Sequence, residues 1–216
     1  MTVDMNNRLL LVDYHSFGSI NYYSTLIKYD RLKIELYEHF RKGSYASRYC
    51  LAGPNGKILL SIPVVHGHRD RTPLASLRIA NRDRWQTLHW RTLTSAYRRS
   101  PWFEFYEEEL RPLYTGGFEY LMDWNRAAFG IVTKWLNLSW DISATSEYQK
   151  HYPEADVDDK RYLVMPGKGK VKEEYAPLVY RQVFEDRTGF IPGLSILDLL
   201  FCEGKRARSL LEASPA

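Results

Sequence analysis

The order of apolar and polar positions at the start of the chain predicts a strand, a helix and a second strand. An apolar run within residues 8–14 is followed by a loop that ends at Gly18 and Ser19. Residues 20–27 then carry apolar side chains at helical spacing, and residues 31–38 alternate between apolar and charged side chains. Because a helix connects the two strands, we expect a β-α-β unit with a parallel strand pair.

A β-hairpin is predicted next. The apolar segments "SRYCLA" and "KILLSIPV" flank the sequence Gly53-Pro54-Asn55-Gly56. Proline supplies a fixed φ, and Asn-Gly favours the positive φ that a chain reversal needs.

The following segment is predicted to be helical. Residues 83–99 place apolar side chains at helical spacing, and residues 118–136 form a longer amphipathic helix. Between them, Ser100 has the character of an N-cap, and Pro101 suits the first position of the next helix.

The C-terminal part is predicted to combine a long loop with a short buried helix. Residues 153–177 are rich in charge, glycine and proline and lack periodicity, whereas Ser195 and Asp198 match a capping box for a helix over 194–202. The last dozen residues are expected to form a polar tail. We therefore predict one α/β domain over 1–216, with a basic strand-rich part over 1–80 and a helical part over 83–148.

Composition is compatible with a protein that folds on its own and carries no membrane span. The chain has 216 residues and 44% hydrophobic content, which is enough for a substantial core. Its first apolar run is too short for a signal peptide, and no stretch approaches the roughly 20 apolar residues of a membrane span. We expect a cytoplasmic protein. Cys50 and Cys202 lack ligand-like spacing, and no cofactor motif is present.

Charge is distributed unevenly along the chain. Residues 41–99 contain twelve Lys or Arg and two Asp, whereas residues 101–160 contain twelve Asp or Glu and five Lys or Arg. The two blocks can simply attract each other in the folded protein. Ten of the twelve basic residues are arginine, whose planar group suits bidentate contacts to phosphate or carboxylate, so anion binding is predicted on this block.

His66 and His68 follow the predicted hairpin and are candidates for chemistry. With His89 or His15 they offer imidazoles to a metal ion, but the pair alone is a weak signal and no metal is predicted. Among arginines an imidazole stays neutral near pH 7, which suits a general base. The alternative is that both histidines are simply exposed.

Two further groups of residues have candidate roles. Arg41, Lys42, Ser44 and Arg48 gather cationic and hydroxyl donors beside the hairpin, where a phosphate would be held well. On the predicted helix over 83–99, one face carries His89 and Tyr97, and this face is either core or the wall of a pocket.

Two motifs are excluded. "MPGKGKVK" lacks the GxxxxGK[ST] spacing of a phosphate-binding loop, and "GLSIL" lacks the second glycine of a nucleophile elbow. Capping explains Ser195 instead.

The chain resembles the WbqC-like family. The resemblance rests on ordered blocks between about residues 9 and 204: "FGSINYY", "FRKGSYASRYCLAGPNGKILLSIPV", "TPL", "WQTLHWRTLTSAYRRSPWFEFYEEELRPLY" and "YRQVFEDRTGFIPGLSILDLLFCEG". It is similar to the Bacteroidota-type branch, in which the first motif lacks a Pro-Trp loop; the "NR" before the hairpin is here Ser47-Arg48.

This resemblance implies a pathway. The family is associated with O-antigen and other polysaccharide gene clusters, and a glycine transferase role has been suggested for it. Such an enzyme would take a nucleotide sugar or another small polyanion, with tRNA as a candidate acyl donor. It would need a base for the amine proton and donors for an oxyanion. The expected roles are anion binding by Arg48, Lys57, Arg91, Arg41, Ser44 and His68, general base at His66 or His89, and hydrogen bonding by Tyr97 or Ser44.

Two other function classes remain open at this point. Aromatic residues interleave with arginine in "DRWQTLHWRTLTSAYRR", which also suits a non-catalytic module that binds nucleic acid or an anionic glycan. A structural partner in a biosynthetic complex is the third reading. The oligomeric state is not predicted.

Overall fold

The N-terminal β-α-β unit is present as predicted. In the computed structural model, which describes residues 8–65, 71–153, 157–161 and 177–214, strand β1 (Leu9–Val12) leads through helix α1 (Ile20–Leu26) to strand β2 (Arg31–Ile34). The two strands pair in parallel. Ser19 begins α1 as an N-cap, because its hydroxyl accepts a hydrogen bond from the Tyr22 amide at 3.2 Å.

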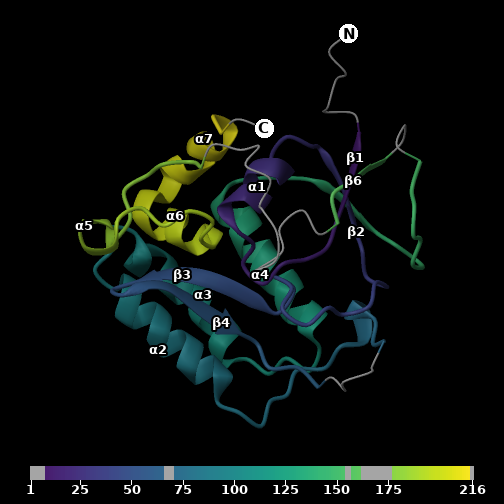
Figure 1. Ribbon diagram of the computed structural model, residues 1–216, viewed down its shortest axis with the longest axis horizontal. Coiled ribbons are helices and arrows are strands. Elements are labelled where there is room, and N and C mark those ends of the chain that lie inside the picture. Colours follow the sequence, from purple (N-terminus) through teal and green to yellow (C-terminus); the bar gives the residue numbers. More distant parts are fainter. Residues whose placement is uncertain (1–7, 66–70, 154–156, 162–176, 215–216) are drawn as a thin grey trace.

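These strands belong to a four-stranded sheet in which every neighbouring pair is parallel. The order is β5-β2-β1-β6, with β5 at Asp141–Ala144 and β6 at Val157–Asp159. Figure 1 shows β1, β2 and β6 side by side. The four carboxyl ends therefore lie at one edge of the sheet.

Neither β5 nor β6 was predicted. The helical part was expected to reach residue 148, and residues 153–177 were expected to form a loop. Every residue of β5 is exposed, and only Val157 of β6 is buried. The two strands are therefore too short and too polar to produce an alternating pattern, and they are held by the ladders to β2 and β1.

The predicted hairpin is confirmed. Strands β3 (Arg48–Gly53) and β4 (Gly56–Ser61) pair antiparallel across Pro54 and Asn55, and Gly56 has a φ of +110°. A positive φ of this size favours glycine, which explains the residue that ends the turn.

Three long helices follow the hairpin. They are α2 (Trp85–Tyr97), α3 (Phe103–Thr115) and α4 (Leu121–Trp135), and between the hairpin and α2 lies a short 3-10 turn, η2 (Leu74–Ser76). Ser100 does not cap α3 as predicted. Its hydroxyl donates to the Tyr97 carbonyl at 2.7 Å at the end of α2, and α3 begins after Trp102.

The C-terminal part is more helical than predicted. It contains α5 (Glu185–Thr188), α6 (Ile196–Glu203), the turn η3 (Gly204–Arg206) and α7 (Ala207–Glu212). Helix α6 matches the predicted helix over 194–202, whereas α7 lies where the sequence suggested a polar tail. Ser195 caps α6 as predicted. Asp198 instead accepts hydrogen bonds from the hydroxyls of Tyr97 and Tyr180, each at 2.6 Å.

One continuous core joins the parallel sheet, the hairpin and the helices, so the chain forms a single α/β domain. Trp124 of α4 lies at its centre, with ring contacts to Phe17, Tyr49 and Trp85. In Figure 1 the hairpin crosses the middle of the molecule, with α2 and α3 beside it and α6 and α7 near α1. Within the described ranges, no helix combines the length and apolar character that crossing a membrane requires.

Candidate functional site

Polar side chains converge where the parallel strands end. Asp13 follows β1, Glu35 and Glu38 follow β2, Thr145 follows β5, and Arg161 follows β6. Ligands of open α/β sheets bind outside the carboxyl ends of the strands. This edge of the sheet is therefore the first place to look for a site.

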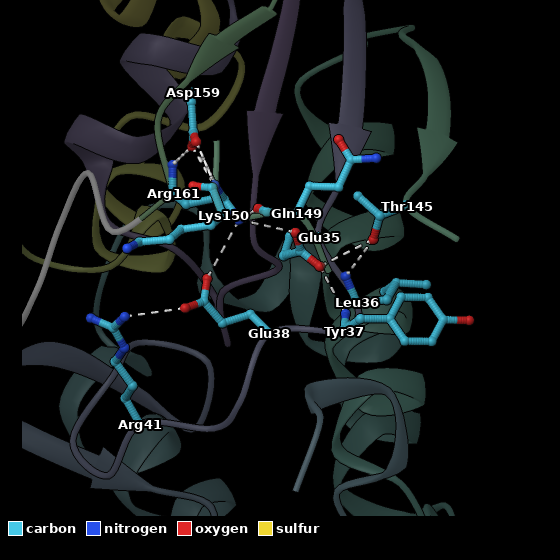
Figure 2. A network of polar contacts seen from close by, with 10 residues as sticks. All are labelled: Glu35, Leu36, Tyr37, Glu38, Arg41, Thr145, Gln149, Lys150, Asp159 and Arg161. Atoms are coloured by element: carbon cyan, nitrogen blue, oxygen red, sulfur yellow. Dashed lines mark hydrogen bonds and ion pairs between the residues drawn. The ribbon is translucent and has the colours of Figure 1, made fainter. Parts of the chain in front are cut away.

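Arg161 joins the ends of β6 and β2. Its guanidinium binds Asp159 through Nε at 3.0 Å and Nη2 at 2.6 Å, and its Nη1 donates to Glu35 Oε2 at 3.3 Å (Figure 2). The same group donates to the carbonyls of Gln149 and Lys150. The Arg161 side chain is only 6% exposed, so these partners compensate a buried charge. The pKa of Arg161 is raised, chiefly by its hydrogen bond with Asp159.

Glu35 is satisfied by the fold itself. It has no exposed surface, and its Oε1 accepts hydrogen bonds from the Tyr37 amide at 2.8 Å and the Thr145 hydroxyl at 3.1 Å. Its Oε2 faces Arg161. Figure 2 shows Glu35 enclosed between Thr145 and Arg161. Glu35 therefore stabilises the fold, and its oxygens have few positions left to bind a ligand.

Glu38 differs from Glu35 because it lies on an open cleft. Its Oε1 accepts from Arg41 Nη2 at 3.1 Å, and its Oε2 lies 3.9 Å from Arg161. Burial raises the pKa of Glu38; Arg41 and Arg161 oppose this effect, and the carboxylate of Asp13 adds to it. A carboxyl group with a raised pKa is suited to exchanging protons.

The cleft is small, and all but one of its lining residues carry polar or charged side chains. Asp13, Glu38, His39, Arg41, Ser44 and Leu74 line it. It has room for about one water-sized group. Asp13 Oδ2 is held at 3.3 Å by His15 Nε2, and the His15 ring stacks on Tyr22.

Ser44 lines this cleft and has a buried hydroxyl that is not used in a hydrogen bond. The residue is 6% exposed, and its Oγ has no hydrogen-bond partner among the described residues. A buried hydroxyl without a partner is costly, since folding removes it from water without compensation. A ligand group in the cleft would supply the missing hydrogen bond.

Of the residues that the sequence singled out, two line this cleft. Arg41 and Ser44 meet there, but with two carboxylates that the sequence reasoning did not include. Arg48 lies beside the same loop, where its guanidinium approaches Gly43, and Lys57 on β4 donates to the Pro192 carbonyl at 3.1 Å. The positive charges of Arg48 and Lys57 each act to lower the pKa of the Cys50 thiol. Both side chains therefore lie near Cys50 on the hairpin.

The sequence placed His89 and Tyr97 on a helix face that was either core or the wall of a pocket. Both residues lie in the core. His89 is 1% exposed; Nε2 donates to the Ser61 carbonyl at 3.2 Å, and Nδ1 accepts from the Tyr49 hydroxyl at 2.9 Å. Tyr97 is fully buried, and its hydroxyl donates to Asp198 and accepts from the Ala52 amide. Neither residue borders the cleft.

The remaining predicted residues lie elsewhere. Arg91 is exposed on α2 in a different hollow. His66 and His68 fall outside the described residues. In the part of the chain that the structure describes, no group of three His, Cys, Asp or Glu side chains is placed to hold a metal ion.

The sequence reasoning missed Asp13, Glu38 and Arg161. A usable signal existed for the first two, because they follow the strands of the predicted β-α-β unit, and carboxyl ends of parallel strands are preferred sites. Arg161 had no such signal, because β6 was not predicted.

Comparison with known proteins identifies the family. A search of the curated proteins and a search of the solved structures each returned no match. A family model, the WbqC-like protein family, matches residues 15–163. That range is well over half of the chain and includes Glu38, Arg41, Ser44 and Arg161. The chain therefore belongs to the WbqC-like protein family.

Proposed function

We propose that the protein is an enzyme that transfers an acyl group, such as glycine, to the amine of an amino sugar or sugar nucleotide. Membership of the WbqC-like family suggests a role in polysaccharide-related biosynthesis. The chemistry of the cleft supports an amine as the group that reacts.

The observation that carries the proposal is the unpaired Ser44 hydroxyl beside two buried carboxylates. Asp13 is 8% exposed and Glu38 6% exposed, and both line the cleft with Ser44. An ammonium group presents three donors and a positive charge to such a set of acceptors. The cleft accepts only a water-sized group, so the amine would enter while the sugar ring stays at the mouth.

Glu38 is the proposed general base. The ionised carboxylate takes a proton from the substrate ammonium, and the free amine attacks the carbonyl carbon of an activated acyl donor. A carbon-nitrogen bond forms, the carbon-oxygen bond to the leaving group breaks, and the leaving oxygen takes the displaced electron pair. The amide product then loses its extra proton to solvent.

Arg41 is the proposed anion-binding group of the same site. Its side chain is about half exposed at the cleft mouth while one nitrogen holds Glu38. We expect the positive charge that Arg41 brings to the cleft to stabilise negative charge on the acyl oxygen or the leaving group. The proposal therefore assigns to Arg41 the anion-binding role that we expected from the sequence.

We assign the base role to Glu38 rather than His89 because of access. Both ring nitrogens of His89 are occupied by protein partners in the core, and burial lowers its pKa to about 4. A base must reach the proton that it abstracts. Glu38 meets this requirement at the cleft.

Binding of an amine can be tested before the donor is known. Isothermal titration should show that an amino sugar binds more tightly than its N-acetyl derivative, because acetylation removes the charge. Glu38→Gln should abolish this preference. Glu108→Gln, an exposed carboxylate on α3 outside the cleft, is the matched control. Equal affinities for the two sugars would contradict amine recognition.

Transfer itself can be measured by mass spectrometry. The purified protein would be incubated with nucleotide-linked amino sugars and with glycyl-tRNA or glycyl adenylate, and the sugar examined for one added glycyl group. Glu38→Gln should reduce the rate about 10²- to 10⁴-fold, as expected for loss of a general base. A Glu38→Gln variant that transfers at the rate of the unmodified protein would exclude this mechanism.

A further inference from the structure

A second hollow lies between α2 and the segment that leads into α5, and it shares no residue with the cleft. Its volume is about 630 Å³. That size is typical of pockets for small molecules. It is lined by Trp90, Arg91, Thr94, Ser95, Ala96, Arg98, Arg99, Val183 and Phe184.

One face of α2 supplies most of the polar groups of this hollow. Arg91, Thr94, Ser95 and Arg98 are spaced i, i+3, i+4 and i+7, so they form a single stripe along the helix. Seven residues of α-helix rise about 10 Å. Two arginines about 10 Å apart, with two hydroxyl groups between them, can converge on a pair of linked phosphates.

The charges of this stripe are not neutralised by any residue that the structure describes. Arg91, Arg98 and Arg99 are exposed, and their guanidinium groups make no hydrogen bond or ion pair with any described residue. No acidic side chain is among the described residues that line the hollow. By contrast, in the adjoining hollow Arg181 is paired with Asp186 and Arg206 with Glu203.

Aromatic side chains form part of the lining. Trp90 and Phe184 are both half-buried, and Trp90 is held in place by ring contacts with Phe103 and Tyr114. A ring fixed in this way can stack against a flat ligand at little entropic cost. Arginine can add a stacking contact of its own.

A purely structural explanation covers only part of this pattern. Arg98 and Arg99 follow the end of α2, where positive side chains stabilise the helix dipole. Arg91 lies about two turns earlier and gains nothing from this effect. The dipole also does not account for the half-buried aromatic rings beside the arginines.

We infer that this hollow binds a nucleoside diphosphate. Three arginines without a partner among the described side chains match the charge of a diphosphate, the exposed Ser95 hydroxyl adds a donor, and Trp90 or Phe184 offers a surface for the base. A longer polyanion is disfavoured, because it would extend over Asp186 and Glu203 in the adjoining hollow. This inference does not depend on the proposed transferase activity.

Isothermal titration with uridine diphosphate, adenosine diphosphate and inorganic pyrophosphate tests the inference. We expect both nucleotides to bind more tightly than pyrophosphate, because of the ring contact. Arg91→Ala and Arg98→Ala should each weaken nucleotide binding about tenfold or more, since each removes a charge-assisted contact. Arg84→Ala, an exposed arginine at the start of the same helix, should leave the affinity unchanged.

Three results would overturn the inference. They are no nucleotide binding at low salt, binding that is insensitive to Arg91→Ala and Arg98→Ala, and binding of single-stranded RNA without binding of nucleotides. The third would indicate a nucleic-acid surface instead. Glu38→Gln should retain nucleotide binding. A result that contradicts nucleotide binding at the hollow can therefore be distinguished from one that contradicts the proposed transfer at the cleft.

Discussion

His89 makes the stability of this protein sensitive to acid. Its ring is buried against Tyr49 and Ser61, and burial lowers its pKa from the usual 6.5 to about 4. The unfolded chain therefore binds a proton at this residue near pH 6.5, whereas the folded protein does so only near pH 4. Between these values protons favour the unfolded state, so stability falls as the pH falls.

The size of the effect follows from the pKa difference. Each pKa unit corresponds to about 1.36 kcal/mol, so a difference of about 2.5 units amounts to about 3 kcal/mol once the pH is below 4. Lowering the pH from 7 to 5 should already remove about 2 kcal/mol through His89 alone. For a domain with a typical free energy of unfolding of about 5–15 kcal/mol, this loss is large.

Urea unfolding at a series of pH values measures this contribution. His89→Gln should lower stability at pH 7 by about 1–3 kcal/mol, because the flexible glutamine amide replaces a rigid ring that packs in the core and bonds at two fixed positions. Its stability should then fall by about 2 kcal/mol less than that of the unmodified protein between pH 7 and 5. Carboxyl groups common to both proteins cancel in this comparison.

The control is His151→Gln, which removes an exposed histidine and leaves His89 in place. If the unmodified protein and His89→Gln lost equal stability from pH 7 to 5, the argument from burial would be refuted. Should His89→Gln fail to fold, an NMR titration of the unmodified protein tests the same point. It should show that the His89 ring stays neutral at pH 5.

Two further predictions concern the frame of the fold, and both use urea unfolding. Arg161→Met should destabilise the protein by about 3–5 kcal/mol, because it leaves the buried Glu35 without its cation; a loss below about 1 kcal/mol would mean that Arg161 does not compensate Glu35. Gly204→Ala should destabilise by about 1–3 kcal/mol or more, because Gly204 has a φ of +55° and an added β-carbon would overlap the Trp102 ring. Gly130→Ala, in an open position on α4, should instead stabilise by about 0.5–1 kcal/mol, and equal signs for the two glycines would contradict this account.

Local sequence patterns were sufficient where an element buries one continuous face. The β-α-β unit, the hairpin and helices α2 and α4 follow from apolar periodicity and turn residues, and all are present. Strands β5 and β6 could not be recognised in this way. They are defined by pairing with β2 and β1, more than 100 residues earlier in the chain, and not by their own composition.

The candidate site also combines residues that local patterns identify with residues that only the tertiary fold brings together. Arg41 and Ser44 were identified because they stand in a polar loop between predicted elements, and both line the cleft. The choice of His89 as a base rested on residue type, without knowledge of burial. Arg161 reaches Glu35 only through the tertiary fold, since 126 residues separate the two in the chain.

The central position of β1 also bears on the order in which the protein forms. Strand β1 has β2 on one side and β6 on the other, so its second edge stays open until a segment about 145 residues later is available. Closing a loop of that length is slow compared with local pairing. During synthesis, one edge of β1 therefore stays unpaired, and Glu35 lacks its cation, until the segment that contains β6 and Arg161 has been made. We conclude that the ion pair between Arg161 and Glu35 is one of the last features to be completed, and that shortened chains ending before β6 would be prone to aggregation.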